Sequence, residues 1–206
     1  MRSKAARMEI KTLFVTKLYR AELAGVDMGD LLKSCRSIAN GDKAGQRWSK
    51  ENGYPGYTSY ASLNDLPKRD PDFAALKLAL DKHAMAFARE LHLDLRGRKL
   101  RLDSIWINVL EPGGVHTSHI HPQSVISGTC YVDVPTNASA LKLEDPRHAM
   151  MMAAPGRLPD APEEERTFVY VTPKAGEVLM WESFIRHEVP MNQAKKARVS
   201  VSFNYS

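Results

Sequence analysis

Three histidines gather in one short stretch of the chain, and this pattern is suited to metal chemistry. The stretch reads Gly113-Gly-Val-His116-Thr-Ser-His119-Ile-His121-Pro122. In an extended strand alternate side chains share a face, so we expect His119 and His121 to point the same way. Two imidazoles at this spacing are able to bind one divalent metal from a single strand. His116 has the opposite parity and is the weaker ligand candidate.

A fourth histidine, His187, is the candidate third ligand. It follows a predicted strand and turn that begin at Gly176, and it stands where the chain returns to the sheet. Together His119, His121 and His187 predict a three-imidazole metal site. The alternative is a set of ordinary surface or core histidines that bind no metal.

The C-terminal segment has two chemically different faces. One face carries Arg198, Ser200, Ser202 and Asn204, and the other carries Val199, Val201, Phe203 and Tyr205. An arginine followed by hydroxyls and an amide indicates a polar pocket for an anion. The Arg198 guanidinium is expected to hold a carboxylate by two hydrogen bonds, with Ser200 adding another. The alternative is the solvated face of an edge strand.

The elements that position these residues change in character near residue 100. Before it we expect a strand over 13–23, a helix over 27–39 that ends at Asn40-Gly41, a loop-like segment over 41–70, and a long helix that Asp70 caps. After it we expect strands over 102–110, 125–134, 141–143, 167–172, 177–181 and 197–205. A helical layer on a sandwich or barrel of short strands makes the fold α+β.

The chain is expected to form a single domain over 1–206. Residues 1–100 supply the N-terminal strand and helical support, and residues 101–206 supply the core that carries the site. The segment 150–165 fits neither structural period and is predicted to be a long loop. We expect this loop and residues 41–70 to shape the substrate side of the pocket.

These motifs resemble a known superfamily. His119-x-His121, the distal His187 and Arg198-x-Ser200 are similar to the signature of the Fe(II)- and 2-oxoglutarate-dependent oxygenases. The neighbouring segments resemble one bacterial subgroup of these oxygenases: Ile105-Trp-Ile-Asn-Val109, Ser127-Gly-Thr-Cys-Tyr131, Leu143-Glu-Asp-Pro-Arg147 and Arg198-Val-Ser-Val-Ser-Phe-Asn204. The resemblance implies a double-stranded β-helix, a jelly-roll or cupin-like barrel, with N-terminal helices packed on the sheet.

The resemblance also implies an activity. The protein is expected to be a non-haem oxidoreductase that hydroxylates a substrate, with Fe(II) as metal and 2-oxoglutarate as co-substrate. His119, His121 and His187 would be the metal ligands, and Arg198 and Ser200 would bind the far carboxylate of 2-oxoglutarate. One departure stands out, because His121 replaces the usual carboxylate ligand and leaves the site one negative charge short. Glu144 or Asp145 is the alternative source of a carboxylate.

Further polar residues are candidates for the co-substrate pocket. Thr129 and Tyr131 share the parity of His119 and His121 if no bulge intervenes, and Asn108 alternates with apolar neighbours. For Trp106 and Trp181, ordinary packing is the expectation.

Three other functions compete with this interpretation. A cupin-type metal dioxygenase or isomerase would use the histidines without 2-oxoglutarate, although the cupin glutamate is missing after His121. A non-catalytic ligand-binding barrel would explain the missing carboxylate. Nucleic-acid binding through the basic segments 96–101 and 194–198 is disfavoured, because neither segment is interleaved with aromatic residues.

Composition narrows the class of protein. The 206 residues include 43% hydrophobic and 26% charged side chains, enough for a core, and the net charge of +5 is scattered. Two cysteines are too few for a disulfide framework, and no signal peptide or membrane-length apolar run is seen. We therefore expect a cytoplasmic protein that acts on a small molecule or peptide, with no membrane partner, and that exists as a monomer or a homodimer.

Overall fold

A computed structural model describes residues 8–206 of the chain. The N-terminal half contains β1 (Tyr19–Glu22), α1 (Met28–Gly41), α2 (Lys43–Glu51), β2 (Gly56–Thr58), α3 (Leu66–Arg69) and α4 (Pro71–Glu90). The C-terminal half contains β3 (Leu102–Leu110), β4 (His116–His119), β5 (Ile126–Asp133), β6 (Leu141–Glu144), β7 (Phe168–Val171), β8 (Glu177–Glu182), β9 (His187–Val189) and β10 (Arg198–Tyr205). None of the helices in this part of the chain is long and apolar enough to cross a membrane.

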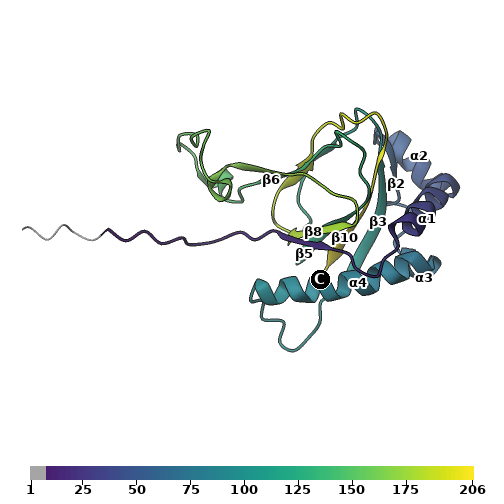
Figure 1. Cartoon of the computed structure of the whole chain (residues 1–206), viewed down its shortest axis with the longest axis horizontal. Helices are drawn as coiled ribbons and strands as arrows, with labels where there is room; N and C mark the ends of the chain where they lie inside the picture. Colours follow the sequence, from purple (N-terminus) through teal and green to yellow (C-terminus); the bar gives the residue numbers. More distant parts are fainter. Residues whose placement is uncertain (1–7) are drawn as a thin grey trace, which may run out of the picture.

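The strands form two antiparallel sheets, and the fold is a double-stranded β-helix of the α+β class. The larger sheet has the order β1-β8-β5-β10-β3-β2, and the smaller has the order β4-β9-β6-β7. Apolar side chains from both sheets meet in one cluster that includes Tyr131, Leu141, Val171 and Trp181. The outer face of the larger sheet is covered by helices, which lie along one side of the barrel (Figure 1).

Helix α4 supports the larger sheet. The side chain of Asp70 accepts a hydrogen bond from the backbone N–H of Asp72, and Pro71 occupies the first turn, so the helix begins where predicted. Its apolar stripe is buried and belongs to the same core cluster as one face of β10: Phe73, Leu76, Leu80, Ala84 and Phe87 from the helix, with Val199, Val201, Phe203 and Tyr205 from the strand. The opposite face of β10 is left to face the inside of the barrel.

The N-terminal half differs from the expectation in two places. The opening strand is shorter, because only Tyr19–Glu22 pairs with β8 and the residues before it have no strand partner among those described. The loop predicted over 41–70 contains α2, β2 and α3. Helix α1 ends at Gly41, as the Asn40-Gly41 signal predicted, but the Asp42 side chain then caps a new helix by accepting the N–H of Gly45.

The segment 150–165 is a long connection, as predicted. It has no strand, and 3-10 turns at His148–Met150 and Glu163–Glu165 form its two ends. It projects away from the barrel between β6 and β7 (Figure 1). The strand expected to carry both His119 and His121 is shorter than assumed, because β4 ends at His119 and leaves His121 in the connection that follows. Strand β9, which begins at His187, was not predicted.

Candidate metal centre and anion pocket

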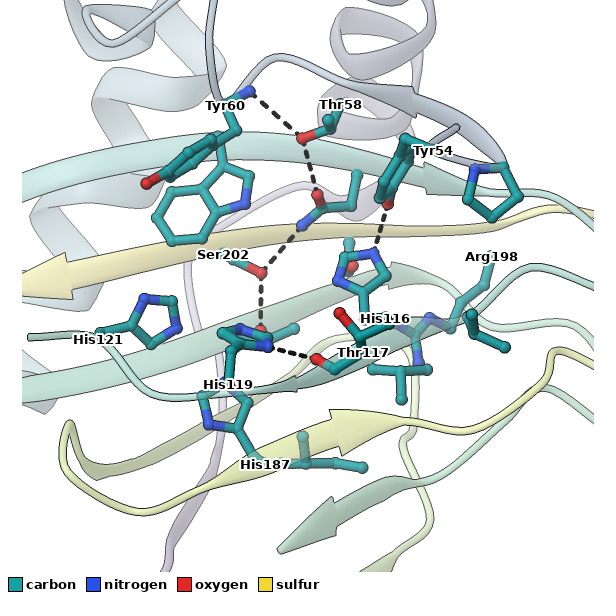
Figure 2. A pocket seen from close by; sticks show the side chains of 18 of the residues that line it. Tyr54, Thr58, Tyr60, His116, Thr117, His119, His121, His187, Arg198 and Ser202 are labelled. Atoms are coloured by element: carbon teal, nitrogen blue, oxygen red, sulfur yellow. Dashed lines mark hydrogen bonds between the residues drawn. The ribbon is translucent and has the colours of Figure 1, made fainter. Parts of the chain in front are cut away.

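His119, His121 and His187 converge in space. One nitrogen atom from each ring lies within 4.8 Å of the other two, and the ring centroids are 4.3 to 5.1 Å apart. Antiparallel pairing of β4 with β9 places His119 opposite His187, and the backbone N–H of His121 donates to the Ser183 carbonyl at 3.1 Å. The three rings therefore approach one point from two strands and the turn after β4 (Figure 2).

Backbone carbonyls orient two of these rings. His119 Nδ1 lies 2.7 Å from the Thr117 carbonyl oxygen, and His187 Nδ1 lies 2.9 Å from the Ile185 carbonyl oxygen. A carbonyl oxygen only accepts hydrogen bonds, so each Nδ1 carries the proton and each Nε2 keeps its lone pair. This is the tautomer that binds a metal through Nε2, with the orienting hydrogen bond typical of metal-binding histidines.

The environment keeps two of the three imidazoles neutral. Burial lowers the pKa of His187 to about 3 and the pKa of His121 to about 4. A metal binds the neutral form of imidazole, so such groups compete little with protons near neutral pH.

The carboxylates proposed as substitute ligands are engaged elsewhere. His148 Nδ1 lies 3.0 Å from Glu144 Oε1, and Asp145 accepts two hydrogen bonds from the Arg147 guanidinium. Among residues 8–206, the group of possible metal ligands at this point consists of the three histidines. The expectation that Glu144 or Asp145 joins the site is therefore not supported.

Arg198 is buried in the same cavity with few partners. It is 2% exposed, and its hydrogen bond in the described chain is from Nη1 to the Ser139 carbonyl at 3.1 Å. Its Nε atom is buried with no acceptor, and the Tyr131 hydroxyl and Ser139 Oγ are also buried without a hydrogen-bond partner. The guanidinium carbon lies 5.5 Å from the centre of the Tyr131 ring. Buried, unsatisfied donors around a buried cation fit an anionic ligand.

A cavity of about 570 Å³ joins the histidines to Arg198. This volume is in the usual range for small-molecule sites. Strand register orders its floor along β3, β10 and β5: Trp106, Ser202 and Thr129 form one row, Asn108, Ser200 and Tyr131 form the next, and Arg198 lies one row farther along β10. All of the predicted pocket residues, Asn108, Thr129, Tyr131, Arg198 and Ser200, line this cavity.

The family of the chain follows from this region. The family model described as "Putative 2OG-Fe(II) oxygenase" matches residues 104–204, the segment that contains the three histidines and Arg198. This segment belongs to the 2OG-Fe(II) oxygenase family, and the chain that carries it is an oxidoreductase.

Solved structures share the fold of this oxygenase at low sequence identity. A Pseudomonas putida prolyl-4-hydroxylase is 16% identical with a TM-score of 0.62, and the match covers 92% of each chain. The epimerase SnoN, in complex with Fe3+, alpha ketoglutarate and nogalamycin RO, is 13% identical with a TM-score of 0.62, covering 92% of this chain and 78% of SnoN. HygX from Streptomyces hygroscopicus, with nickel and 2-oxoglutarate bound, is 16% identical with a TM-score of 0.55, covering 93% and 82%. No curated protein sequence matches the chain.

A chain of hydrogen bonds stiffens the cavity floor of the oxygenase. The Thr58 hydroxyl donates to Asn108 Oδ1 at 3.0 Å, Asn108 Nδ2 donates to Ser202 Oγ at 3.0 Å, and Ser202 Oγ lies 2.9 Å from Thr129 Oγ1. This series of hydrogen bonds links β2, β3, β10 and β5 (Figure 2). Asn108 and Thr129 therefore hold the floor together as well as line it.

The sequence analysis missed His116 as a cavity residue. The register of β4 against β9 shifts between His116 and His119, so strict alternation fails and both side chains reach the cavity. His116 Nε2 shares a hydrogen bond with the Tyr54 hydroxyl. No local pattern in the sequence marks this shift.

Aromatic residues were also underestimated. Trp106 and Trp181 are buried, and Trp181 packs in the core cluster as expected, but both rings also line the cavity of the oxygenase, as does Trp48. Trp106 and Trp181 contact the histidines, with ring centroids 5.8 Å from His121 and 4.7 Å from His187 respectively.

Of the two segments expected to shape the substrate side of the pocket, 41–70 and 150–165, only the first lines the cavity. The predicted loop 41–70 contributes Trp48, Tyr54 and Tyr60 to the cavity, as expected. The expectation for 150–165 is wrong, because none of its residues lines the cavity and the segment projects away from the barrel.

Proposed function

We propose that this chain is an Fe(II)- and 2-oxoglutarate-dependent dioxygenase that hydroxylates its substrate. In this proposal His119, His121 and His187 hold the metal, and Arg198 binds the 5-carboxylate of 2-oxoglutarate. The observation that carries it is Arg198, a buried guanidinium without an acidic partner in the cavity that the three histidines face.

The residues of the chain fit both groups. When bound, Fe(II) supplies the oxygen activation, for which three protein ligands on one face leave coordination positions open. The Thr117 and Ile185 carbonyls hold His119 and His187 with Nε2 available. Arg198 Nε and the Tyr131 hydroxyl supply unused donors for a carboxylate, and Ser200 lines the cavity between Arg198 and the metal ligands.

The rest of the cavity favours a neutral substrate group. Among residues 8–206, no acidic or lysine side chain lines it, and Arg198 is committed to the co-substrate in this proposal. The end near His121 is aromatic, since Trp106 lies against both His121 and Tyr60. We propose a small-molecule or peptide substrate rather than a nucleic acid, and a cytoplasmic location, which the two buried free cysteines support.

Binding measurements with purified protein test this proposal. In protein loaded with Mn(II), we expect Arg198→Gln to weaken 2-oxoglutarate binding at least about tenfold, since a hydrogen bond to a charged group contributes ~1.5–3 kcal/mol. Calorimetry gives the affinity, and metal analysis should show unchanged Mn(II). His187→Ala should lose the metal instead. The matched control is Arg147→Gln, which removes a guanidinium outside the cavity.

Two results would contradict the assignment. Equal 2-oxoglutarate affinity in wild type and Arg198→Gln would remove the anion role and favour a cupin-type metal enzyme. Equal metal content in wild type and His187→Ala would remove the metal site and favour a non-catalytic barrel. Production of succinate from 2-oxoglutarate by the Fe(II)-loaded protein would support the proposed activity directly.

A further inference from the structure

His116 and Tyr54 close one end of the cavity. His116 lies on β4 of the smaller sheet, and Tyr54 lies in the connection that leads into β2, the edge strand of the larger sheet. The Tyr54 hydroxyl and His116 Nε2 share a hydrogen bond, and the two rings meet edge to face with centroids 5.1 Å apart. This contact bridges the two sheets over the cavity (Figure 2).

Strand register places this contact at the Arg198 end. Gly56, two residues after Tyr54, pairs with Leu110 on β3, and Leu110 pairs with Arg198 on β10. On the other sheet His119 pairs with the metal-ligand candidate His187, whereas His116 pairs with Val189, farther from that point. The Tyr54–His116 pair and Arg198 therefore lie beyond the histidine triad at the same end of the cavity.

The pair is a fixed and uncharged wall. Burial, with a further contribution from the nearby Arg198 guanidinium, lowers the pKa of His116 to about 3. Burial raises the pKa of the Tyr54 hydroxyl. Both groups are therefore neutral near pH 7, and neither supplies a counter-charge to Arg198. The pair therefore affects an anion bound to Arg198 by limiting the space open to that anion and not by attracting or repelling its charge.

We propose that His116, held by Tyr54, determines the length of the 2-oxo acid that this enzyme accepts. This inference rests on the proposed function, in which the ligand runs from the metal ligands to Arg198. A dicarboxylate of the right length places its far carboxylate on Arg198, and one more methylene drives that carboxylate into the imidazole. His116 is a specificity-determining residue on this view, and Tyr54 is a positioning residue.

Calorimetry on the full-length protein loaded with Mn(II) tests this inference, with 2-oxoglutarate and its one-methylene-longer homologue 2-oxoadipate as probes. The measured quantity is the ratio of the two dissociation constants. We expect wild type to prefer 2-oxoglutarate and His116→Ala to reduce that preference at least about tenfold, because an imidazole occupies more space than a methylene group. Tyr54→Phe keeps the ring but removes the hydrogen bond, so it should shift the ratio in the same direction by less.

The controls separate this inference from the proposed function. His148→Ala makes the same substitution at an exposed histidine outside the cavity and should leave the ratio unchanged. His116→Asn, a smaller polar replacement, gives a second test if His116→Ala fails to fold. Wild type that binds 2-oxoglutarate through Arg198, with an unchanged ratio in the folded His116 variants, would overturn the inference alone. Wild type that binds neither acid would overturn the proposed function and this inference with it.

Discussion

At the residue scale, the most informative side chains are those whose hydrogen bonds are missing. Tyr131 and Tyr205 are both fully buried tyrosines on neighbouring strands. The Tyr205 hydroxyl donates to Asp81 Oδ1 at 2.8 Å, whereas the Tyr131 hydroxyl has no partner. A buried polar group without a partner costs stability, so its presence in a cavity indicates that a ligand completes it.

The two tyrosines give a paired prediction. Tyr131→Phe should weaken 2-oxoglutarate binding several-fold and leave the metal-free protein as stable as wild type or up to about 1 kcal/mol more stable, because an unsatisfied hydroxyl is removed. Tyr205→Phe should instead lower the free energy of unfolding by about 1–3 kcal/mol, because the Asp81 carboxylate loses one of its two donors and keeps only Lys77. Urea unfolding and calorimetry measure the two effects. A Tyr131→Phe protein destabilised as much as Tyr205→Phe would argue against an unpaired hydroxyl.

Residue types and the alternation of side chains along strands predicted much of the site from the sequence. The alternation over β10 correctly assigned Arg198, Ser200 and Ser202 to the cavity and the other face to the core, because β10 itself is continuous. Its register shifts against β5 and β3 pass over a residue of the partner strand. The same reasoning made His116 the weaker ligand candidate, and His116 is indeed outside the triad, but the assumed regular alternation also placed it on the face opposite His119, although both line the cavity. A register shift is decided by pairing with β9, about 70 residues away, and local sequence does not encode it.

At the element scale, long periodic segments were predictable and short ones were not. Helix α4 has a cap, a first-turn proline and a full apolar stripe, so its sequence determines its position. Strands β4 and β9 have four and three residues, too few to show a period. They exist because each pairs with the other and β9 also pairs with β6. Tertiary pairing therefore creates the elements that carry the histidines.

The start of β2 shows how closely one element fits its neighbour. Gly56 has φ of 128°, a region that favours glycine, and a Cβ atom there would lie 2.0 Å from the Val109 carbonyl oxygen. Only a residue without a side chain lets β2 approach β3 this closely, and this approach also places Tyr54 over the cavity.

Glycine substitutions test this fit. Gly56→Ala should lower the free energy of unfolding by about 2 kcal/mol or more, because backbone strain and a collision with Val109 act together. The control is Gly53→Ala, where φ is also positive at 64° but nothing lies within 4 Å of the new Cβ. It should cost about 1 kcal/mol from backbone strain. Equal losses in urea unfolding would mean that the close approach to β3 does not matter.

At the scale of the whole molecule, the folded protein buries several uncharged imidazoles around the cavity. Burial lowers the pKa values of His116, His121 and His187 to about 3, 4 and 3. In the unfolded chain histidine titrates near its ordinary pKa of ~6.5. Between about pH 6.5 and pH 4 the unfolded state therefore binds more protons than the folded state, and the folded state loses stability as the pH falls.

This linkage predicts a pH-dependent stability for the metal-free protein. From pH 7 to pH 5 we expect the free energy of unfolding to fall, with roughly 1–2 kcal/mol from each of the two most buried rings, His116 and His187. Urea unfolding at both pH values measures it. His116→Gln should reduce this dependence, and His148→Gln, at an exposed site, should keep it. An unchanged dependence in His116→Gln would contradict the buried, neutral state of that ring.

The distribution of indole rings has a practical consequence. The chain contains three tryptophans, and all three line the cavity. Tryptophan fluorescence therefore originates entirely from the walls that a ligand would touch. A compound that enters should change the emission without any label, so libraries of uncharged candidate substrates are open to direct optical screening on the unmodified protein.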